Sequence, residues 1–227
     1  MKIGILQTGH VPEDLQAENG NYDQIFAQFL DGRGFEFDTY AVVDGVFPTG
    51  AQAADGWLIT GSRYGAYEDL AWIAPLEELI REIYASERAM IGVCFGHQII
   101  AQALGGRVEK VAKGWSIGRQ DYPLNGQSYA LNAWHQDQVV TCPPGAEVVS
   151  QTDFCEHAAL LYDNRIFTIQ PHPEIDKRYL KGLLDVRAPG VVPAPLCEAA
   201  TAQLDQPTDS AALADMFALF FTEKRLG

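Results

Sequence analysis

Hydrophobic and polar positions in the first hundred residues alternate between the spacing of strands and the spacing of helices. Short apolar or aromatic runs predict β-strands at residues 2–7, 35–43, 57–60 and 90–93. Between these runs, apolar side chains with helical spacing predict helices at residues 22–30, 75–84 and 96–104. Strands and helices that alternate through short links indicate a mostly parallel central sheet flanked by helices on both faces.

The pattern changes in the middle of the chain. Turn signals such as Asn125-Gly126 and Asp163-Asn164 separate short strand-like runs at residues 128–134, 146–151, 158–162 and 166–170. Runs joined this closely predict an antiparallel extension of the same sheet. A helix is expected from Glu174 to Val186, then an irregular connection at 187–209 and a C-terminal helix at 210–224. We therefore expect one α/β domain over residues 1–227, with its core at residues 2–186.

Composition and charge narrow the choice of partners and compartment. The chain has 30 acidic and 16 basic residues, a formal net charge of −14, which disfavours binding to nucleic acid or to anionic lipid. The N-terminus lacks the pattern of a signal peptide, and no apolar stretch approaches the ~20 residues that cross a bilayer. The four cysteines contain no C-x-x-C pair, so we expect neither a disulfide framework nor a zinc site. These features predict a cytoplasmic protein.

Cys94 lies where a predicted buried strand meets a predicted helix, with Gly92 and Gly96 two positions away on each side. This is the layout of a nucleophile elbow, a sharp turn that lifts the side chain out of the core. The helix N-terminus favours the thiolate form, which a free cysteine with a pKa of about 8.5 rarely adopts at pH 7. A buried cysteine that serves only as a small apolar side chain is the alternative.

A thiol nucleophile needs a base, and His172 is the best candidate. Pro171 and Pro173 force an extended backbone on both sides of it, so His172 and Glu174 project to the same side. Glu174 can then orient one ring nitrogen while the other faces the sulfur of Cys94, as in a catalytic triad. Taken alone, the segment could equally be a rigid surface turn.

At this point the sequence resembles a known family. The segment Gly92–Gln98, read as GVCFGHQ and followed by Gly105-Gly106, is similar to the G-x-C-x-G-x-Q motif of class I glutamine amidotransferases, and the order Cys, His, Glu also matches. The resemblance implies a flavodoxin-like topology and hydrolysis of a γ-glutamyl amide through a γ-glutamyl thioester on Cys94. Many members have Leu where this chain has Phe95, which is a mild change at an apolar position.

The remaining site residues follow from the elbow and from the resemblance. The amide of Phe95, directly after the nucleophile, is expected to bind the oxyanion, and the resemblance implies Gly61 as the second donor. Many members carry Gly-Gly-Pro where this chain has Thr60-Gly61-Ser62. The resemblance also implies that substrate is bound by Gln98 and by the segment His135-Gln136-Asp137, which a metal site could otherwise explain. Ser62 and Arg63, in the loop after Gly61, could line the pocket and pair with a substrate carboxylate. We expect no metal and no other cofactor.

Three functions stay open at this stage. The first is a glutaminase or amidotransferase that delivers ammonia to a separate synthetase subunit, because these 227 residues contain no P-loop. The second is a hydrolase of γ-glutamyl peptides or γ-glutamyl amines. The third is a non-catalytic paralogue that binds a ligand.

Overall fold

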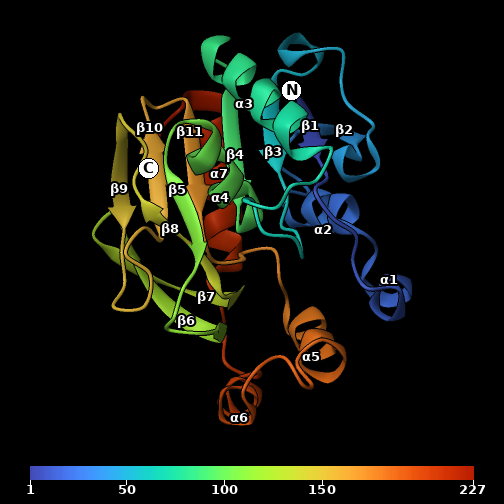
Figure 1. Cartoon of the computed structure of the whole chain (residues 1–227), viewed down its shortest axis with the longest axis vertical. Coiled ribbons are helices and arrows are strands. Elements are labelled where there is room, and N and C mark those ends of the chain that lie inside the picture. Colours follow the sequence, from blue (N-terminus) through green and yellow to red (C-terminus); the bar gives the residue numbers. More distant parts are fainter.

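A central sheet of seven strands runs through the computed structural model, which describes all residues 1–227 (Figure 1). Its order is β2-β1-β3-β4-β11-β10-β9. The parallel strands are β1 (Lys2–Leu6), β2 (Glu36–Tyr40), β3 (Gly56–Ile59), β4 (Ala89–Val93) and β11 (Ile166–Ile169). Two antiparallel strands, β10 (Ala159–Tyr162) and β9 (Ala146–Ser150), extend the sheet beyond β11. The predicted parallel sheet with an antiparallel extension is therefore confirmed. The run predicted at 128–134 does not join it, because it pairs with residues 116–124 in a separate two-stranded sheet.

The burial of each strand's residues depends on whether the strand is central or at the edge of the sheet. Every residue of β3, β4 and β11 is buried, whereas the edge strand β2 has none that is fully buried. Parallel strands with helices on both faces need apolar side chains on both sides, which explains their continuous apolar runs. The carboxyl ends of these three central strands meet at one edge of the sheet, where the candidate site lies.

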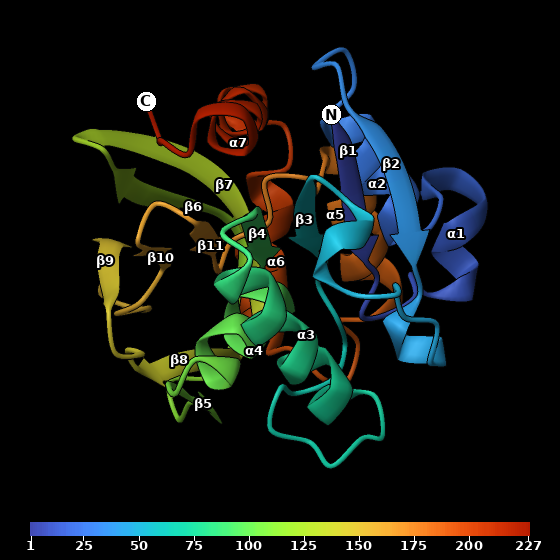
Figure 2. The ribbon, with the colours of Figure 1, turned by 90° about the horizontal axis from the view of Figure 1, so that it is seen from above.

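Helices cover both faces of the sheet. Helices α3 (Ile73–Ala85) and α4 (Phe95–Ala103) contribute Leu76, Ile80 and Ile99 to the core on one face. On the other face, α2 (Tyr22–Phe29) and α7 (Ser210–Glu223) pack aromatic side chains together, among them Phe29 and Phe217 with ring centroids 5.5 Å apart. Figure 2 shows α3 and α7 on opposite sides of the sheet.

The remaining elements lie outside the central sheet, most of them near the edge that carries the site. They comprise two strand pairs, β5 (Arg107–Lys110) with β8 (Asp137–Thr141) and β6 (Ser116–Leu124) with β7 (Gln127–His135), together with the helices α1 (Glu13–Asn19), α5 (Lys177–Val186) and α6 (Ala194–Ala202), and two short 3₁₀ helices, η1 (Val42–Asp44) and η2 (Ala51–Ala53). Asn125 and Gly126, with φ of +51° and +73°, form the tight turn between β6 and β7, as their sequence predicts. None of the helices combines the length and apolar character that crossing a membrane requires.

Several predictions of local structure were wrong. The strand at 166–170 lies within the parallel part of the sheet, because β11 inserts between β4 and β10. The run at 35–43 ends early as a strand, and η1 follows it. The stretch 187–209 is not irregular throughout, since it contains α6, which starts with Pro193 at its N-cap and Pro195 in its first turn. Proline is compatible with that turn, so a proline-rich composition alone does not exclude a helix.

Two buried histidines, His97 on α4 and His135 at the end of β7, lie close to Cys94 in the chain fold and differ from exposed histidines in their pKa values. His97 is fully buried, and its Nδ1 lies 2.7 Å from the Thr168 hydroxyl on β11. Burial lowers the pKa of His97 to about 3, and nearby His157 and His135 lower it further. Burial likewise lowers the pKa of His135 to about 4. Both rings are therefore uncharged in the folded protein at neutral pH.

We predict that the folded state loses stability as the pH falls from 7 to 5. In this range the unfolded chain binds protons at both histidines while the folded protein does not, so unfolding becomes more favourable. For His97 alone the expected loss is about 2 kcal/mol. Urea unfolding at both pH values checks this: His97→Asn should show a smaller loss than the wild type. Thr168→Val removes the hydrogen-bond partner but keeps the ring, so it should retain the wild-type pH dependence.

Candidate active site

Cys94 occupies a strained turn between β4 and α4. Its φ of +53° and ψ of −103° are unusual for a residue with a side chain, and such strain persists only where the surroundings enforce it. The Cys94 N–H donates to the Ile169 carbonyl at 2.9 Å. A Cβ at Gly96 would lie 2.4 Å from the Ile59 carbonyl oxygen, and one at Gly92 would lie 2.6 Å from the Gly96 carbonyl oxygen. Only glycine permits this approach, and the turn that it permits brings Cys94 to the edge of a cavity.

His172 is held next to this turn by backbone hydrogen bonds and by its own side-chain partner. It follows β11, and its N–H donates to the Asn132 carbonyl of β7 at 2.8 Å. The Asn132 side chain in turn donates to the Ile175 carbonyl at 2.9 Å. His172 Nδ1 lies 2.6 Å from Glu174 Oε1, and both side chains are buried. The predicted pairing of His172 with Glu174 is thus present in the geometry.

The electrostatics of His172 depend on its two neighbours. Burial lowers the pKa of His172, but the charge of Glu174, the charge of Cys94 and hydrogen bonding to both outweigh it. The pKa of His172 therefore lies well above its ordinary value. Contact with a carboxylate on one side and the Cys94 sulfur on the other favours the protonated form of the imidazole.

Gly61 closes this group from the side of β3. A Cβ at this position would lie 3.1 Å from His172 Cε1 and 3.9 Å from Cys94 Cβ, so Gly61 lies directly against both side chains. The Gly61 N–H makes no hydrogen bond within the protein. Phe95 is the first residue of α4, so its N–H has no acceptor within the helix. Two N–H donors are therefore available beside the sulfur.

A cavity of about 550 Å³ opens from Cys94 and His172. Among the predicted site residues, those that line it are Ser62, Arg63, Cys94, Gln98, His135, Gln136, Asp137 and His172. The other three, Gly61, Phe95 and Glu174, lie outside its lining and support it from behind. The topology therefore brings together residues that are up to 110 positions apart in the chain, from Ser62 to His172.

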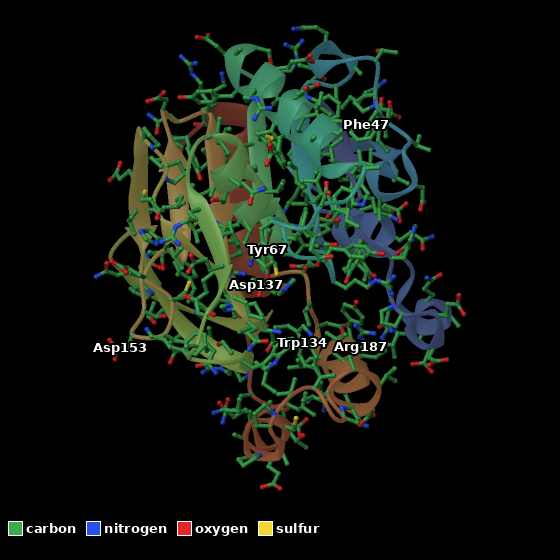
Figure 3. The ribbon with its side chains drawn as sticks, in the orientation of Figure 1. Phe47, Tyr67, Trp134, Asp137, Asp153 and Arg187 are labelled. Carbon is green, nitrogen blue, oxygen red and sulfur yellow. The ribbon has the colours of Figure 1, made fainter.

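Two of the cavity-lining residues hold the wall together. Gln98 Nε2 donates to the Asp137 carbonyl at 3.0 Å and to Gln170 Oε1 at 3.1 Å. The Asp137 carboxylate accepts a hydrogen bond from the Tyr67 hydroxyl at 3.1 Å, and Figure 3 shows this pair of side chains together. The pKa of Asp137 lies above its ordinary value, because burial raises it by more than the bond to Tyr67 and the charge of Lys110 lower it.

Ser62 and Arg63 differ in their freedom. The Ser62 hydroxyl donates to the Thr8 carbonyl at 2.6 Å and accepts from the Tyr64 N–H, so it braces the loop. Arg63 is exposed, contacts the Tyr64 hydroxyl at 2.8 Å and lies 4.9 Å from the centre of that ring. Arg63 makes no ion pair and can still bind an anion in the cavity.

Sequence reasoning missed several residues that line the same cavity: Tyr22, Lys110, Trp115, Tyr179 and Arg187. Tyr22 has the helical spacing of the core-facing residues of α2, so the sequence predicts that it packs in the core but not that it lines the cavity. The others lie on segments whose course depends on the tertiary structure. No group of three or more His, Cys, Asp or Glu side chains is arranged to bind a metal ion.

Comparison with known proteins is consistent with this geometry. The family model for class-I glutamine amidotransferases matches residues 48–181. The chain belongs to the class-I glutamine amidotransferase family. It is 30% identical over 183 residues to γ-glutamyl peptidase 3 of Arabidopsis thaliana, with 73% of this chain and 74% of that protein covered. It is also 30% identical over 128 residues to a glutamine-hydrolysing GMP synthase subunit of Sulfurisphaera tokodaii, which covers 52% of this chain and 68% of that protein.

Solved structures share the fold of this family member. The glutamine amidotransferase of Methylobacillus flagellatus superimposes with a TM-score of 0.77 over 99% of this chain and 92% of that one, at 21% identity. A glutamine amidotransferase of Thermotoga maritima superimposes with a TM-score of 0.74 over 98% and 97% of the two chains, at 19% identity. At these identities the likeness supports the fold alone.

We predict that Glu174→Gln lowers the pKa of His172. The carboxylate charge is the largest influence that raises this pKa, and glutamine keeps the shape of the side chain without its charge. An NMR titration of the His172 ring checks the direction of the shift. Glu13→Gln is a matched control, because Glu13 lines the cavity but is exposed and has no contact with His172. An unchanged His172 pKa in Glu174→Gln would contradict the electrostatic role of the pair.

Proposed function

We propose that this protein hydrolyses γ-glutamyl amides with Cys94 as nucleophile, His172 as acid and base, and Glu174 as the group that orients the imidazole. The observation that carries the proposal is the buried 2.6 Å contact between His172 Nδ1 and Glu174 beside the strained Cys94 turn. A structural cysteine needs neither a strained elbow nor a charged histidine beside it. The order of the three residues in the chain also matches the family motif.

In the proposed reaction, His172 holds the proton of the Cys94 thiol, and the resulting thiolate attacks the γ-carbonyl carbon of the substrate. The negative charge that develops on the carbonyl oxygen is bound by the N–H groups of Gly61 and Phe95. His172 gives its proton to the leaving nitrogen as the carbon–nitrogen bond breaks, which leaves a γ-glutamyl thioester on Cys94. Water, from which His172 takes a proton, then attacks the thioester and releases glutamate and the thiol.

The γ-glutamyl group is proposed to bind on the side of the cavity formed by the loop after β3 and the turn between β7 and β8. Asp137 suits the substrate ammonium group, and Arg63 suits its α-carboxylate. Gln98 fixes the backbone of Asp137. Ser62 shapes the loop that carries Arg63, while His135 and Gln136 complete the wall. Asp137 and Arg63 keep the predicted contact with substrate, whereas Gln98 and Ser62, predicted to bind substrate, would act through the residues that they hold in place.

The leaving group separates two versions of this function. The relatives named above include a γ-glutamyl peptidase, and a cavity of about 550 Å³ falls in the range of sites that bury a whole organic ligand. We therefore favour γ-glutamyl peptides or γ-glutamyl amines as substrates over glutamine. The alternative is a glutaminase that passes ammonia to a separate synthetase, as the GMP synthase relative suggests.

All four cysteines are free thiols, which supports a reducing cytoplasm as the compartment.

We predict that Cys94→Ala lowers turnover of γ-glutamyl substrates by roughly 10⁶, because removal of the nucleophile leaves only binding and the oxyanion donors. A coupled glutamate-release assay measures this. Cys155→Ala is a matched control, since Cys155 is a buried free cysteine that does not line the cavity. If Cys94→Ala retained wild-type turnover, the nucleophile would be another group.

We further predict that γ-glutamyl peptides are cleaved with a higher kcat/KM than glutamine. A peptide fills more of the cavity than ammonia does, and that binding energy can stabilise the transition state. A panel assay that follows amino acid release against ammonia release decides the point. Faster ammonia release from glutamine would favour an amidotransferase that serves a separate synthetase. Absence of any hydrolysis, together with resistance of Cys94 to alkylation, would favour a non-catalytic binding protein.

A further inference from the structure

The positive charges around the cavity stand out because they lack acidic partners. Most basic side chains in the chain form ion pairs, for example Arg33 with Asp215 and Arg165 with Glu87. The three basic residues that line the cavity, Arg63, Lys110 and Arg187, form none. The same cavity is also lined by Glu13, Glu68 and Asp137, so it offers both cations and carboxylates, and the three cations without an ion pair can bind the anionic groups of a ligand.

These cations lie on different walls. Arg63 follows β3 and Lys110 ends β5, beside the wall to which Asp137 belongs. Arg187 ends α5 and acts on the phenols of Tyr22 and Tyr179, whose pKa values its charge lowers against a larger rise from burial. Figure 3 shows Arg187 beside Trp134 and apart from the pair of Tyr67 and Asp137. Free glutamine has a single carboxylate, whereas a γ-glutamyl peptide has one on each side of the scissile amide.

The wall around Arg187 is aromatic. Trp115 and Trp134 line it with ring centroids 6.1 Å apart and planes tilted by 59°. Both indoles are only partly buried, and they pack against the cluster that includes Leu183 of α5. An open apolar surface of this kind gains free energy when an apolar or aromatic group covers it.

A buried polar group also faces this part of the cavity. Tyr179 is only 3% exposed and lines the cavity, where its hydroxyl lies near the phenol of Tyr22 but makes no hydrogen bond of normal length. Buried hydroxyl groups are normally well hydrogen-bonded, so a hydroxyl in the wall of a site without such a bond is suited to a polar atom of a ligand. Tyr22 and Tyr179 line the same cavity as Cys94 and His172, and the charge of Glu174 raises the pKa of both phenols.

We propose that Trp115, Trp134, Tyr179 and Arg187 form a leaving-group subsite that binds an amino acid with an apolar or aromatic side chain and a free α-carboxylate. This inference rests on the proposed function and specifies its substrate class as γ-glutamyl peptides of apolar amino acids. The indoles cover the side chain, Arg187 pairs with the carboxylate, and the Tyr179 hydroxyl hydrogen-bonds a polar atom near the scissile amide. On hydrolysis the bond between the γ-carbonyl carbon and nitrogen breaks, the amino acid nitrogen takes the proton from His172, and water supplies the oxygen of the new glutamate carboxylate.

The test compares two substrates that differ in one carboxylate. γ-Glutamylphenylalanine and γ-glutamylphenethylamine share the aromatic leaving group, but only the first has the carboxylate that Arg187 would bind. Wild-type protein should prefer γ-glutamylphenylalanine, and Arg187→Gln should reduce this preference in kcat/KM by about tenfold or more, as expected for a charge-assisted hydrogen bond. Trp115→Leu should lower kcat/KM for γ-glutamylphenylalanine more than for γ-glutamylglycine.

Arg178→Gln is the matched control. Arg178 lies on the same helix but pairs with Asp176 and does not line the cavity, so the preference should stay at the wild-type value. Thermal unfolding of each variant checks that the fold is intact. Equal effects of Arg187→Gln on both substrates, or no effect on either, would overturn the subsite while leaving the proposed hydrolase in place. If the wild type cleaves no γ-glutamyl compound, the proposed function and the subsite both fall.

Discussion

The buried contact between His172 and Glu174 is the interaction on which the site depends. A carboxylate that is almost fully enclosed costs free energy unless its charge is balanced, and one oxygen of Glu174, Oε2, has no hydrogen-bond partner. Its charge is instead compensated by the neighbouring imidazole, whose pKa it raises. Burial of the Glu174 carboxylate therefore costs the fold some stability, while its contact with His172 fixes the imidazole beside Cys94. Removal of either partner would leave the other buried without compensation.

The sheet supplies the precision that this contact requires. β4 ends at the strained turn of Cys94, β11 ends just before Pro171 and His172, and Cys94 N–H bonds directly to the last residue of β11. Adjacent parallel strands thus deliver the nucleophile and the base to the same edge. Additional elements hold the base from outside: β7 bonds to His172 through Asn132, and Ser210 at the start of α7 donates to the Pro173 carbonyl. The segment around His172 is fixed on three sides, which limits the entropy lost on reaching the reactive geometry.

The sequence predicted the parts of this structure that depend on local patterns. Continuous apolar runs identified the central strands, and the spacing of Gly92 and Gly96 around Cys94 identified the elbow, because both features are properties of neighbouring residues. The direction of β11 could not be predicted, since an apolar run fits a parallel or an antiparallel central strand equally well. Helix α6 was missed because Pro193 and Pro195 suggested an irregular chain. Likewise, the sequence could suggest that Asp137 belongs to the site but not that Tyr67 would bond to it, because that contact joins the loop after β3 to the first residue of β8, 70 positions later.

The distinction between local and tertiary information also divides the site by function. The proposed nucleophile, base and oxyanion donors lie on short sequence motifs, and in the proposed reaction they define which bond is broken. The residues on the far wall, such as Trp115, Tyr179 and Arg187, come from a loop, the interior of α5 and its end, which converge only in the folded chain. The residues proposed to break the bond and those proposed to bind the leaving group lie on different segments of the chain. Substitutions in one set can therefore occur without changes in the other. If the proposed subsite is correct, changes in these outer elements alone would alter the leaving group that the site accepts while the elbow and the histidine stay the same.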